Sequence, residues 1–405
     1  MLDLINLAPA LEVALLGAVI ALLPVAVVAR RARRQGVHGW VAWQRVLTVL
    51  TLFLTLDLVV FGAFTRLTDS GLGCPDWPGC YGETSPFGAH ADISAAHAAM
   101  PTGPVSHSKA WIEMAHRYLA TAVGALITWL MVAAWVKRRQ PGALSPWWAT
   151  ITFLWVCAQG AFGALTVTLK LQPIIVTGHL LGALLGVGLL TAQVRATAGT
   201  PATAMGPMQA WAASGLRKAG WLVLALVVLQ IALGGWVSTN YAVLACSEWP
   251  MCQGQWWPEM DVEMGFRLLR PLGEDGRGAF ITLAGLTAIH MVHRLFAVVV
   301  LGVLVAYGLA LRRWAATCGG DAVAWRREGQ VLYGLAAWQL FSGLSNVVLG
   351  WPLLAALAHT LGAALLVWRL VHLLVCPRPA LQHQAGSQAR PVVPDSPSDS
   401  GMLHV

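Results

Sequence analysis

Charge is what this 405-residue sequence has least of: Asp, Glu, Lys and Arg make up only 11% of it, whereas 57% of the residues are apolar. A soluble globular domain carries about 25% charged residues, so the scarcity of charge excludes that class. What is present instead is a series of long apolar stretches, and a bilayer-spanning helix needs about 20 such residues. The sequence therefore predicts an all-α integral membrane protein.

Nine stretches are long and apolar enough to predict spanning helices. They lie near residues 10–29, 46–66, 112–136, 147–169, 174–194, 219–240, 281–311, 330–350 and 353–375. A signal sequence is the competing interpretation of the first stretch. That stretch has neither a basic start nor a small-residue cleavage site, so we expect it to remain as a helix.

Basic residues cluster in alternate predicted loops, and this bias sets the expected orientation. If the chain starts outside, the cytoplasmic side collects the clusters at 30–34, 137–139, 217–218, 312–313 and 326–327, while most acids lie opposite. The net charge of +8 then follows from topology, and no basic patch on a soluble face indicates nucleic-acid binding. Residues 377–405, rich in Pro, Ser and Gln, are predicted to form a disordered cytoplasmic tail.

Four of the seven cysteines form two closely spaced pairs in outer loops: CPDWPGC from Cys74 to Cys80, and CSEWPMC from Cys246 to Cys252. The outer compartment is oxidising, and disulfides persist there. A four-cysteine zinc site is the competing interpretation, although zinc sites prefer tighter spacing within each pair. The sequence therefore favours two disulfides.

These loops reveal an internal duplication. GAFTRLTDSGLGCPDWPGC from Gly62 aligns without a gap with GGWVSTNYAVLACSEWPMC from Gly234, and residues 159–183 align with residues 339–363. We therefore predict two tandem four-helix bundles in parallel orientation, preceded by one extra N-terminal transmembrane helix. The predicted divisions are 1–44 for the extra helix and its basic loop, 45–200 and 201–376 for the two halves, and 377–405 for the tail.

Four histidines hold matching places in this repeat: His116 and His179 in the first half, His293 and His359 in the second. Each lies one to two turns from the outer end of its predicted helix, so all four are expected at one depth. A lone histidine on an apolar helix is usually a packed residue, but two symmetry-related pairs favour ligands. Haem iron takes two imidazoles, and the core of a helix bundle can hold it. The residues therefore predict one haem site in each half.

With these motifs in place, the sequence resembles the haem A synthase family, which converts haem O to haem A for cytochrome oxidase. The resemblance covers roughly residues 45–375. It rests on TRLTDSGLGCPDWPGC, WIEMAHR, GHLLG, the second cysteine loop, IHMVHR and AHTLGA. Both cysteine pairs of one branch of the family are present. The helix before Arg30 departs from the usual eight-helix pattern.

The resemblance implies a role for each motif. His116 and His179 would flank the substrate haem O, and His293 and His359 would ligate a permanent haem b. The important glutamate of the family matches Glu113, which lies three residues before His116 and so shares its helix face. It would handle protons while a haem methyl group is oxidised to a formyl group. The second half has His290 at that place, so the two sites are not equivalent.

Several assignments stay open at this point. Arg117 and Arg294 follow the histidines and either bind haem propionates or are ordinary interfacial arginines. Glu113 itself has an alternative as an exposed interfacial acid. Asp57 lies in the middle of a predicted span, where an acid is energetically costly. It either forms part of a proton path or makes a hydrogen bond within the bundle. His90, His97 and His107 in the long outer loop are expected to be solvated.

The resemblance also implies partners and a location. The expected partners are haem O, an unidentified electron donor, haem O synthase, assembly factors of cytochrome oxidase and a second copy in a homo-oligomer. The expected location is the bacterial inner membrane, with both cysteine loops periplasmic and the C-terminus cytoplasmic. Two rival functions remain: a di-haem b cytochrome that passes electrons to or from quinone, and a non-catalytic haem carrier.

Overall fold

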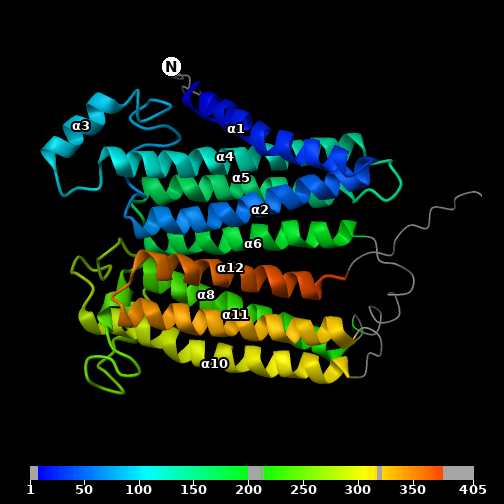
Figure 1. Cartoon of the computed structure of the whole chain (residues 1–405). Helices are drawn as coiled ribbons and strands as arrows, with labels where there is room; N and C mark the ends of the chain where they lie inside the picture. Colours follow the sequence, from blue (N-terminus) through cyan, green and yellow to red (C-terminus); the bar gives the residue numbers. More distant parts are fainter. Residues whose placement is uncertain (1–7, 199–210, 212–213, 317–321, 377–405) are drawn as a thin grey trace, which may run out of the picture.

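The computed structural model describes residues 8–198, 211, 214–316 and 322–376, and all of their regular structure is helical (Figure 1). Within these ranges nine helices are long and apolar enough to cross a membrane. They are α1 (Ala8–Arg34), α2 (Trp40–Leu67), α4 (His107–Val136), α5 (Pro146–Thr168), α6 (Pro173–Thr197), α8 (Gly215–Thr239), α10 (Leu283–Ala315), α11 (Ala322–Val348) and α12 (Leu353–Leu374).

The nine helices fall on the nine predicted spans, and several of them are longer than predicted. α4 begins at His107 and α11 at Ala322, because apolar length measures only the part of a helix that lipid can surround. Short helices also occur between the spans: α3 (His90–Ala99), η2 (Ala242–Ala245) and α9 (Val262–Gly265). The predicted tail at 377–405 lies outside the described residues.

The spanning helices pack as two sets of four. In the first helix group, α2 packs on α4, α4 on α5, α5 on α6, and α6 back on α2. In the second helix group, α8, α10, α11 and α12 close in the same way. The two groups meet where α12 packs on α2 and α6, and where α6 packs on α8. The extra helix α1 packs on α4 and α2, and lies along one edge of the molecule (Figure 1).

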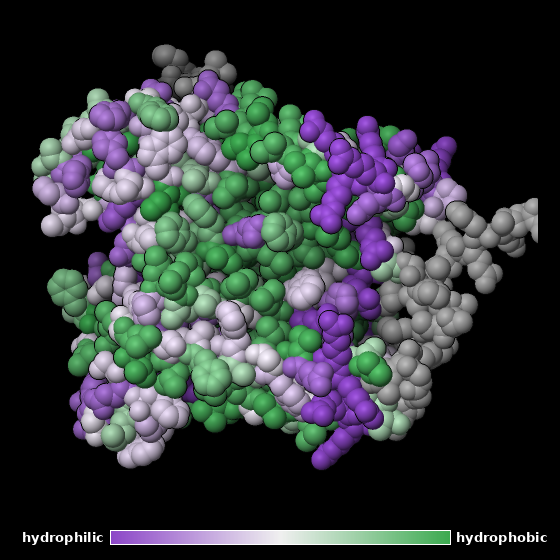
Figure 2. All heavy atoms as spheres, in the orientation of Figure 1, coloured by the Kyte–Doolittle hydropathy of each residue, from purple (hydrophilic) through white to green (hydrophobic). Residues whose placement is uncertain are grey.

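The surface is arranged as a bilayer requires. On the face drawn in Figure 2, a broad apolar band crosses the middle of the molecule, with strongly hydrophilic residues at one end and a mixed surface at the other. Large apolar side chains on the outer faces of the helices remain exposed, among them Leu15, Phe53 and Leu154. Such an exposed band suits lipid rather than water. The chain is therefore a multi-pass membrane protein.

Both cysteine loops have the same backbone. Each contains a cis Trp–Pro bond, at Pro78 and at Pro250, and each has an isolated antiparallel bridge just after it, Cys80 with Glu83 and Cys252 with Gln255. Tyr81 and Gln253 follow with φ values of 53° and 55°. The two loops therefore follow the same backbone path between their cysteines and directly after them.

Candidate haem-binding and oxidation site

The first cysteine loop is closed by a disulfide between Cys74 and Cys80, with Cα atoms 4.9 Å apart. The second loop is closed by Cys246 and Cys252 at the same Cα distance. All four cysteines are fully buried. The prediction of two disulfides is confirmed, and the four-cysteine zinc alternative is wrong because each sulfur is bonded to another sulfur.

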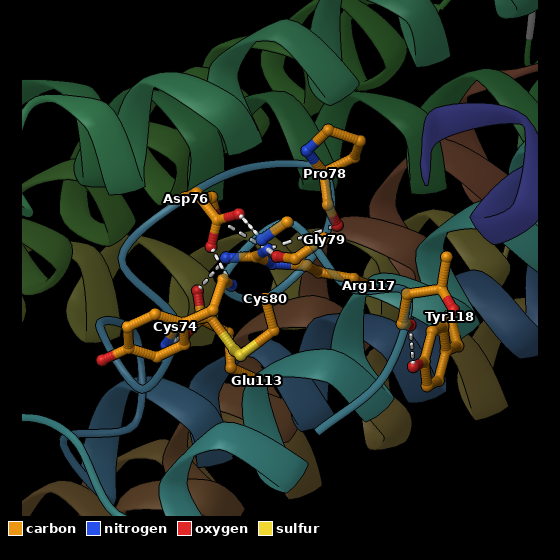
Figure 3. Close-up of a disulfide and its surroundings, with 11 residues drawn as sticks. Cys74, Asp76, Pro78, Gly79, Cys80, Glu113, Arg117 and Tyr118 are labelled. Carbon is orange, nitrogen blue, oxygen red and sulfur yellow. Dashed lines mark hydrogen bonds and ion pairs between the residues drawn. A yellow bond between two sulfur atoms is a disulfide. The ribbon is translucent and has the colours of Figure 1, made fainter. Parts of the chain in front are cut away.

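Glu113 and Arg117 lie beneath the first cysteine loop on one face of α4 (Figure 3). Glu113 is only 4% exposed, which excludes an interfacial acid. Its Oε1 accepts a hydrogen bond from Arg117 Nη2 at 2.5 Å, and its Oε2 accepts one from the backbone N–H of Cys74 at 2.8 Å. A carboxylate held by two donors is a fixed charge directly under the disulfide.

Arg117 is as fully engaged as Glu113. Its Nη1 donates to the backbone carbonyls of Asp76, Pro78 and Gly79 in the cysteine loop. Arg117 is therefore a buried residue that holds the loop onto α4, and it is not an exposed interfacial arginine. Figure 3 shows its side chain reaching into the loop that the disulfide closes.

The second cysteine loop is also held by an arginine, but this arginine bonds to a histidine and not to an acid. Arg294 on α10 donates from Nη2 to the carbonyl of Cys246 at 2.9 Å and from Nη1 to that of Met251 at 3.2 Å. Its Nε donates to Nε2 of the buried His290 at 3.1 Å. A histidine that accepts this bond does so with a neutral ring nitrogen. The acid of the first loop has no counterpart here.

The four predicted ligands lie in pairs, one pair in each helix group. His116 on α4 faces His179 on α6, and His293 on α10 faces His359 on α12, with the two rings of each pair close enough to interact electrostatically. Phe61 on α2 lies parallel to the His116 ring, with centroids 6.3 Å apart. The histidines therefore come from the same two positions in each group.

Each of these histidines rests against a glycine of the neighbouring helix. A Cβ at Gly62 would come within 3.0 Å of the His116 ring, and one at Gly163 within 3.7 Å of His179. In the second group, the corresponding separations are 3.0 Å from Gly234 to His293 and 3.1 Å from Gly343 to His359. A side chain at Gly62, Gly234 or Gly343 would press on the neighbouring imidazole, whereas a Cβ at Gly163 would only make ordinary contact with His179.

This arrangement fits a bis-histidine haem better than a metal centre built from side chains. Two facing imidazoles suffice for a haem iron, and glycines beside them let a flat ring approach closely. Within the described ranges, no group of three or more His, Cys, Asp or Glu side chains is placed to hold a metal ion. Nδ1 of His179 is buried without a hydrogen-bond partner. This is expected of an imidazole that a bound group, and not another protein side chain, holds in place.

The two helix groups are joined at one end by four residues, here called the junction cluster: Arg66, Asp69, Ser238 and Tyr241. Arg66 Nη2 donates to the carbonyl of Ser238 at 2.6 Å, and its guanidinium lies 4.1 Å from the centre of the Tyr241 ring. The Tyr241 hydroxyl donates to Asp69 Oδ1 at 2.5 Å. Burial raises the pKa of Tyr241, and the nearby Arg66 acts in the opposite direction.

The other polar residues singled out in the sequence lie away from the histidine pairs. Asp57 is exposed on the outer face of α2, so it does not bond within the bundle as one alternative had it. In the outer loop, Nε2 of His107 lies 3.0 Å from Ser94 Oγ, and its ring is 4.4 Å from that of His90. Nδ1 of His97 lies 3.3 Å from the carbonyl of Val105.

Sequence reasoning missed several residues that contact the site. Gln230 and Ser342 reach the rings of His293 and His359, and the junction cluster joins the two groups. The repeat alignment held a signal for the first two, because Gln230 stands one turn before Gly234 and Ser342 one residue before Gly343, and both glycines match glycines of the first half. Their counterparts in the first half are the apolar Leu58 and Phe162.

The fold and these residues define an all-helical, multi-pass membrane protein with two facing, glycine-backed histidine pairs. Comparison with known proteins then shows which family this chain is similar to. The family described as "Cytochrome oxidase assembly protein" (COX15-CtaA) matches residues 45–371. A haem A synthase of Shewanella oneidensis is 34% identical over 322 residues, covering 80% of this chain and 93% of the relative. A haem A synthase of Methylorubrum extorquens is 31% identical, covering 83% and 86%.

The chain belongs to the haem A synthase family. It is thus a haem A synthase, an oxidoreductase, and the family implies haem as the bound group. The matched region begins at residue 45, so α1 (Ala8–Arg34) lies before it.

Proposed function

We propose that the two helix groups are duplicated halves with divided labour, occupying residues 45–200 and 201–376. The first would bind the substrate haem O between His116 and His179, and the second would hold a permanent haem b between His293 and His359. Matching histidines, glycines and cysteine-loop backbones support the duplication. The difference between the loop partners, Glu113 and His290, supports the division of labour.

The observation that carries the proposal is the placement of Glu113. It is the acid of the α4 face that also carries His116, it is buried, and its counterpart in the second group is a neutral histidine. Oxidation of a methyl group to a formyl group removes protons as well as electrons. Each oxygen of the Glu113 carboxylate accepts one hydrogen bond from its protein donors and keeps a lone pair with which it can accept a proton.

The remaining residues would support this chemistry without taking part in it. Arg117 and the Cys74 N–H fix where the carboxylate stands. The glycines at 62 and 163 give room to the imidazoles of His116 and His179, and the disulfide loop covers the Glu113–Arg117 pair. Haem b, when bound, supplies one-electron redox chemistry.

The orientation and partners follow the same proposal. The cysteine loops would face the periplasm, because the basic clusters such as 30–34 and 137–139 lie at the opposite ends of the helices and basic loops stay on the cytoplasmic side. The C-terminus would then be cytoplasmic, in a bacterial inner membrane. The proposed partners are an electron donor, haem O synthase, assembly factors of cytochrome oxidase and a second copy of the chain.

The experiment that tests the function is extraction of the pigments from protein purified out of cells that supply haem O, followed by chromatography. We expect haem b together with haem O or haem A. Haem b alone would contradict the synthase and favour a di-haem electron carrier, which needs no acid in one half only. A chain with no haem b would contradict the assignment of the second group.

A further inference from the structure

The two histidine pairs differ in what holds the imidazoles. Nδ1 of His359 lies 3.0 Å from the hydroxyl oxygen of Ser342 on α11. That hydroxyl donates its own hydrogen to the carbonyl of Trp338 at 2.6 Å, so its oxygen is free to accept one. Ser342 is therefore set to accept a hydrogen bond from Nδ1–H, which leaves Nε2 as the ring nitrogen available to a metal.

The other histidine of the second pair is also held by a side chain. The amide nitrogen of Gln230 on α8 lies 3.0 Å from Nδ1 of His293 and 3.2 Å from its backbone carbonyl oxygen. Gln230 stands one turn before Gly234, against which the same ring rests. The amide nitrogen also lies 3.4 Å from Nε2 of the ring, so Gln230 and Gly234 both lie against the edge of the imidazole that carries Cε1.

The first pair has apolar residues in both of these places. Phe162 aligns with Ser342, directly before Gly163, and Leu58 aligns with Gln230, one turn before Gly62. The Phe162 ring is directed toward Gly178, next to His179, where a Cβ would meet it at 3.2 Å. Nδ1 of His179 is buried and has no partner. Phenylalanine cannot accept the Nδ1–H bond that serine accepts.

We propose that Ser342 is a positioning residue that makes the second histidine pair a permanent haem site, and that Phe162 leaves the first pair without such a partner so that its haem can exchange. This inference rests on the proposed assignment of haem b and haem O. A hydrogen bond to the far nitrogen of a ligating histidine fixes its tautomer and orientation and raises its basicity, and losing it costs about 10–100-fold in metal affinity. Tighter binding suits a permanent cofactor, whereas it would slow the release of a substrate that must leave.

The test measures haem transfer from the purified, haem-loaded protein to excess apomyoglobin. Ser342→Ala should release haem b about 10–100-fold faster, and Ser342→Thr should restore slow release. Ser345→Ala is the matched control, because Ser345 makes the same bond to a helix carbonyl, Phe341 O at 2.8 Å, without being the serine that reaches His359. Unchanged release from Ser342→Ala would overturn the inference.

A second readout separates positioning from general loosening of the fold. Without the acceptor on Nδ1–H, His359 donates less to ferric iron, so the midpoint potential of haem b should rise in Ser342→Ala and stay in place in Ser345→Ala. In the first group, Phe162→Ser should slow release of haem O or haem A, while Phe162→Ala should not. An unchanged potential together with unchanged release from Phe162→Ser would contradict the proposal.

The failure of this inference differs from that of the proposed function. If His359→Ala removes haem b while Ser342→Ala changes neither its release nor its potential, only the role of Ser342 is wrong. If His359→Ala leaves haem b in place, the assignment of the second pair is wrong.

Discussion

The first and second helix groups use one framework for two tasks. Both place histidines on their second and fourth helices, both set a glycine behind each ring, and both fasten a disulfide loop with an arginine. They differ in a few side chains at matching places, Glu113 against His290 and Phe162 against Ser342. The comparison teaches that the two groups share one framework of histidines, glycines and loops, and that they differ in single residues beside the histidine pairs.

The largest expected effect comes from replacing the histidines, which tests the comparison of the two groups directly. His293→Ala or His359→Ala should abolish the low-spin haem b spectrum, because a bis-histidine iron loses half of its axial ligands. His116→Ala or His179→Ala should keep that spectrum and lose haem A. Reduced-minus-oxidised spectra and pigment chromatography measure both. An unchanged haem b spectrum in both second-group variants would remove the basis for the assignment.

The next effect concerns the acid present in only one group. Glu113→Gln should lower haem A formation by about 100-fold or more, the range expected for loss of a general acid–base group, with haem O accumulating. Arg117 and the Cys74 N–H donate to different oxygens of Glu113, and glutamine would set its own NH2 donor against one of them, so the loop is also loosened. Glu113→His copies the pairing of the second group and should be as inactive.

The comparison variant for this prediction is Arg117→Met, which keeps the acid but removes both the anchor of the loop and the donor that fixes the carboxylate. The measurement is the ratio of haem A to haem O in purified protein. If Glu113→His makes haem A at the wild-type rate, the acid has no chemical role and Glu113 only anchors the loop.

A smaller effect compares the two arginines. Arg117→Met leaves a buried carboxylate without its cation, which costs about 3–5 kcal/mol when a buried pair is broken. Arg294→Met leaves only a neutral histidine and should cost less. Thermal unfolding midpoints of the two variants in one detergent measure the difference. Equal destabilisation would mean that the loop carbonyls, and not the buried charge, dominate the role of Arg117.

The smallest expected effect concerns the disulfides. Both close loops of the same length, with a sequence separation of 6, so replacing either pair by serine should cost about the same, roughly 2 kcal/mol in the chain-entropy model. Haem A formation should fall more for Cys74→Ser/Cys80→Ser, because the Cys74 N–H donates to Glu113. An equal fall in haem A formation for both pairs would show that this N–H is unimportant.

The spans were predictable because apolar length is a property of the sequence, and the matching histidines were predictable because the repeat aligns them. The partner of Glu113 was not. Helix periodicity placed Glu113 on the same helix face as His116. In the structure its carboxylate accepts a hydrogen bond from the backbone N–H of Cys74, 39 positions away. The path of the loop that brings Cys74 there cannot be read from any periodicity. Ser342 was missed for a related reason: its place directly before Gly343 could be read from the repeat, but the contact of its hydroxyl with His359 on the next helix could not.

The junction cluster has a consequence for how the molecule is assembled. Arg66 contacts Ser238 and Asp69 contacts Tyr241, and the members of each pair are 172 positions apart, which is the offset of the repeat. On the proposed duplication, each residue touches its own counterpart, as happens beside a twofold axis. Two copies of the first half about that axis would set arginine against arginine and aspartate against aspartate. The different residues of the second half would then favour pairing of unlike halves, and a chain split between α6 and α8 should reassemble as mixed pairs when differently tagged halves are co-expressed. Recovery of like pairs would show that this selection is absent.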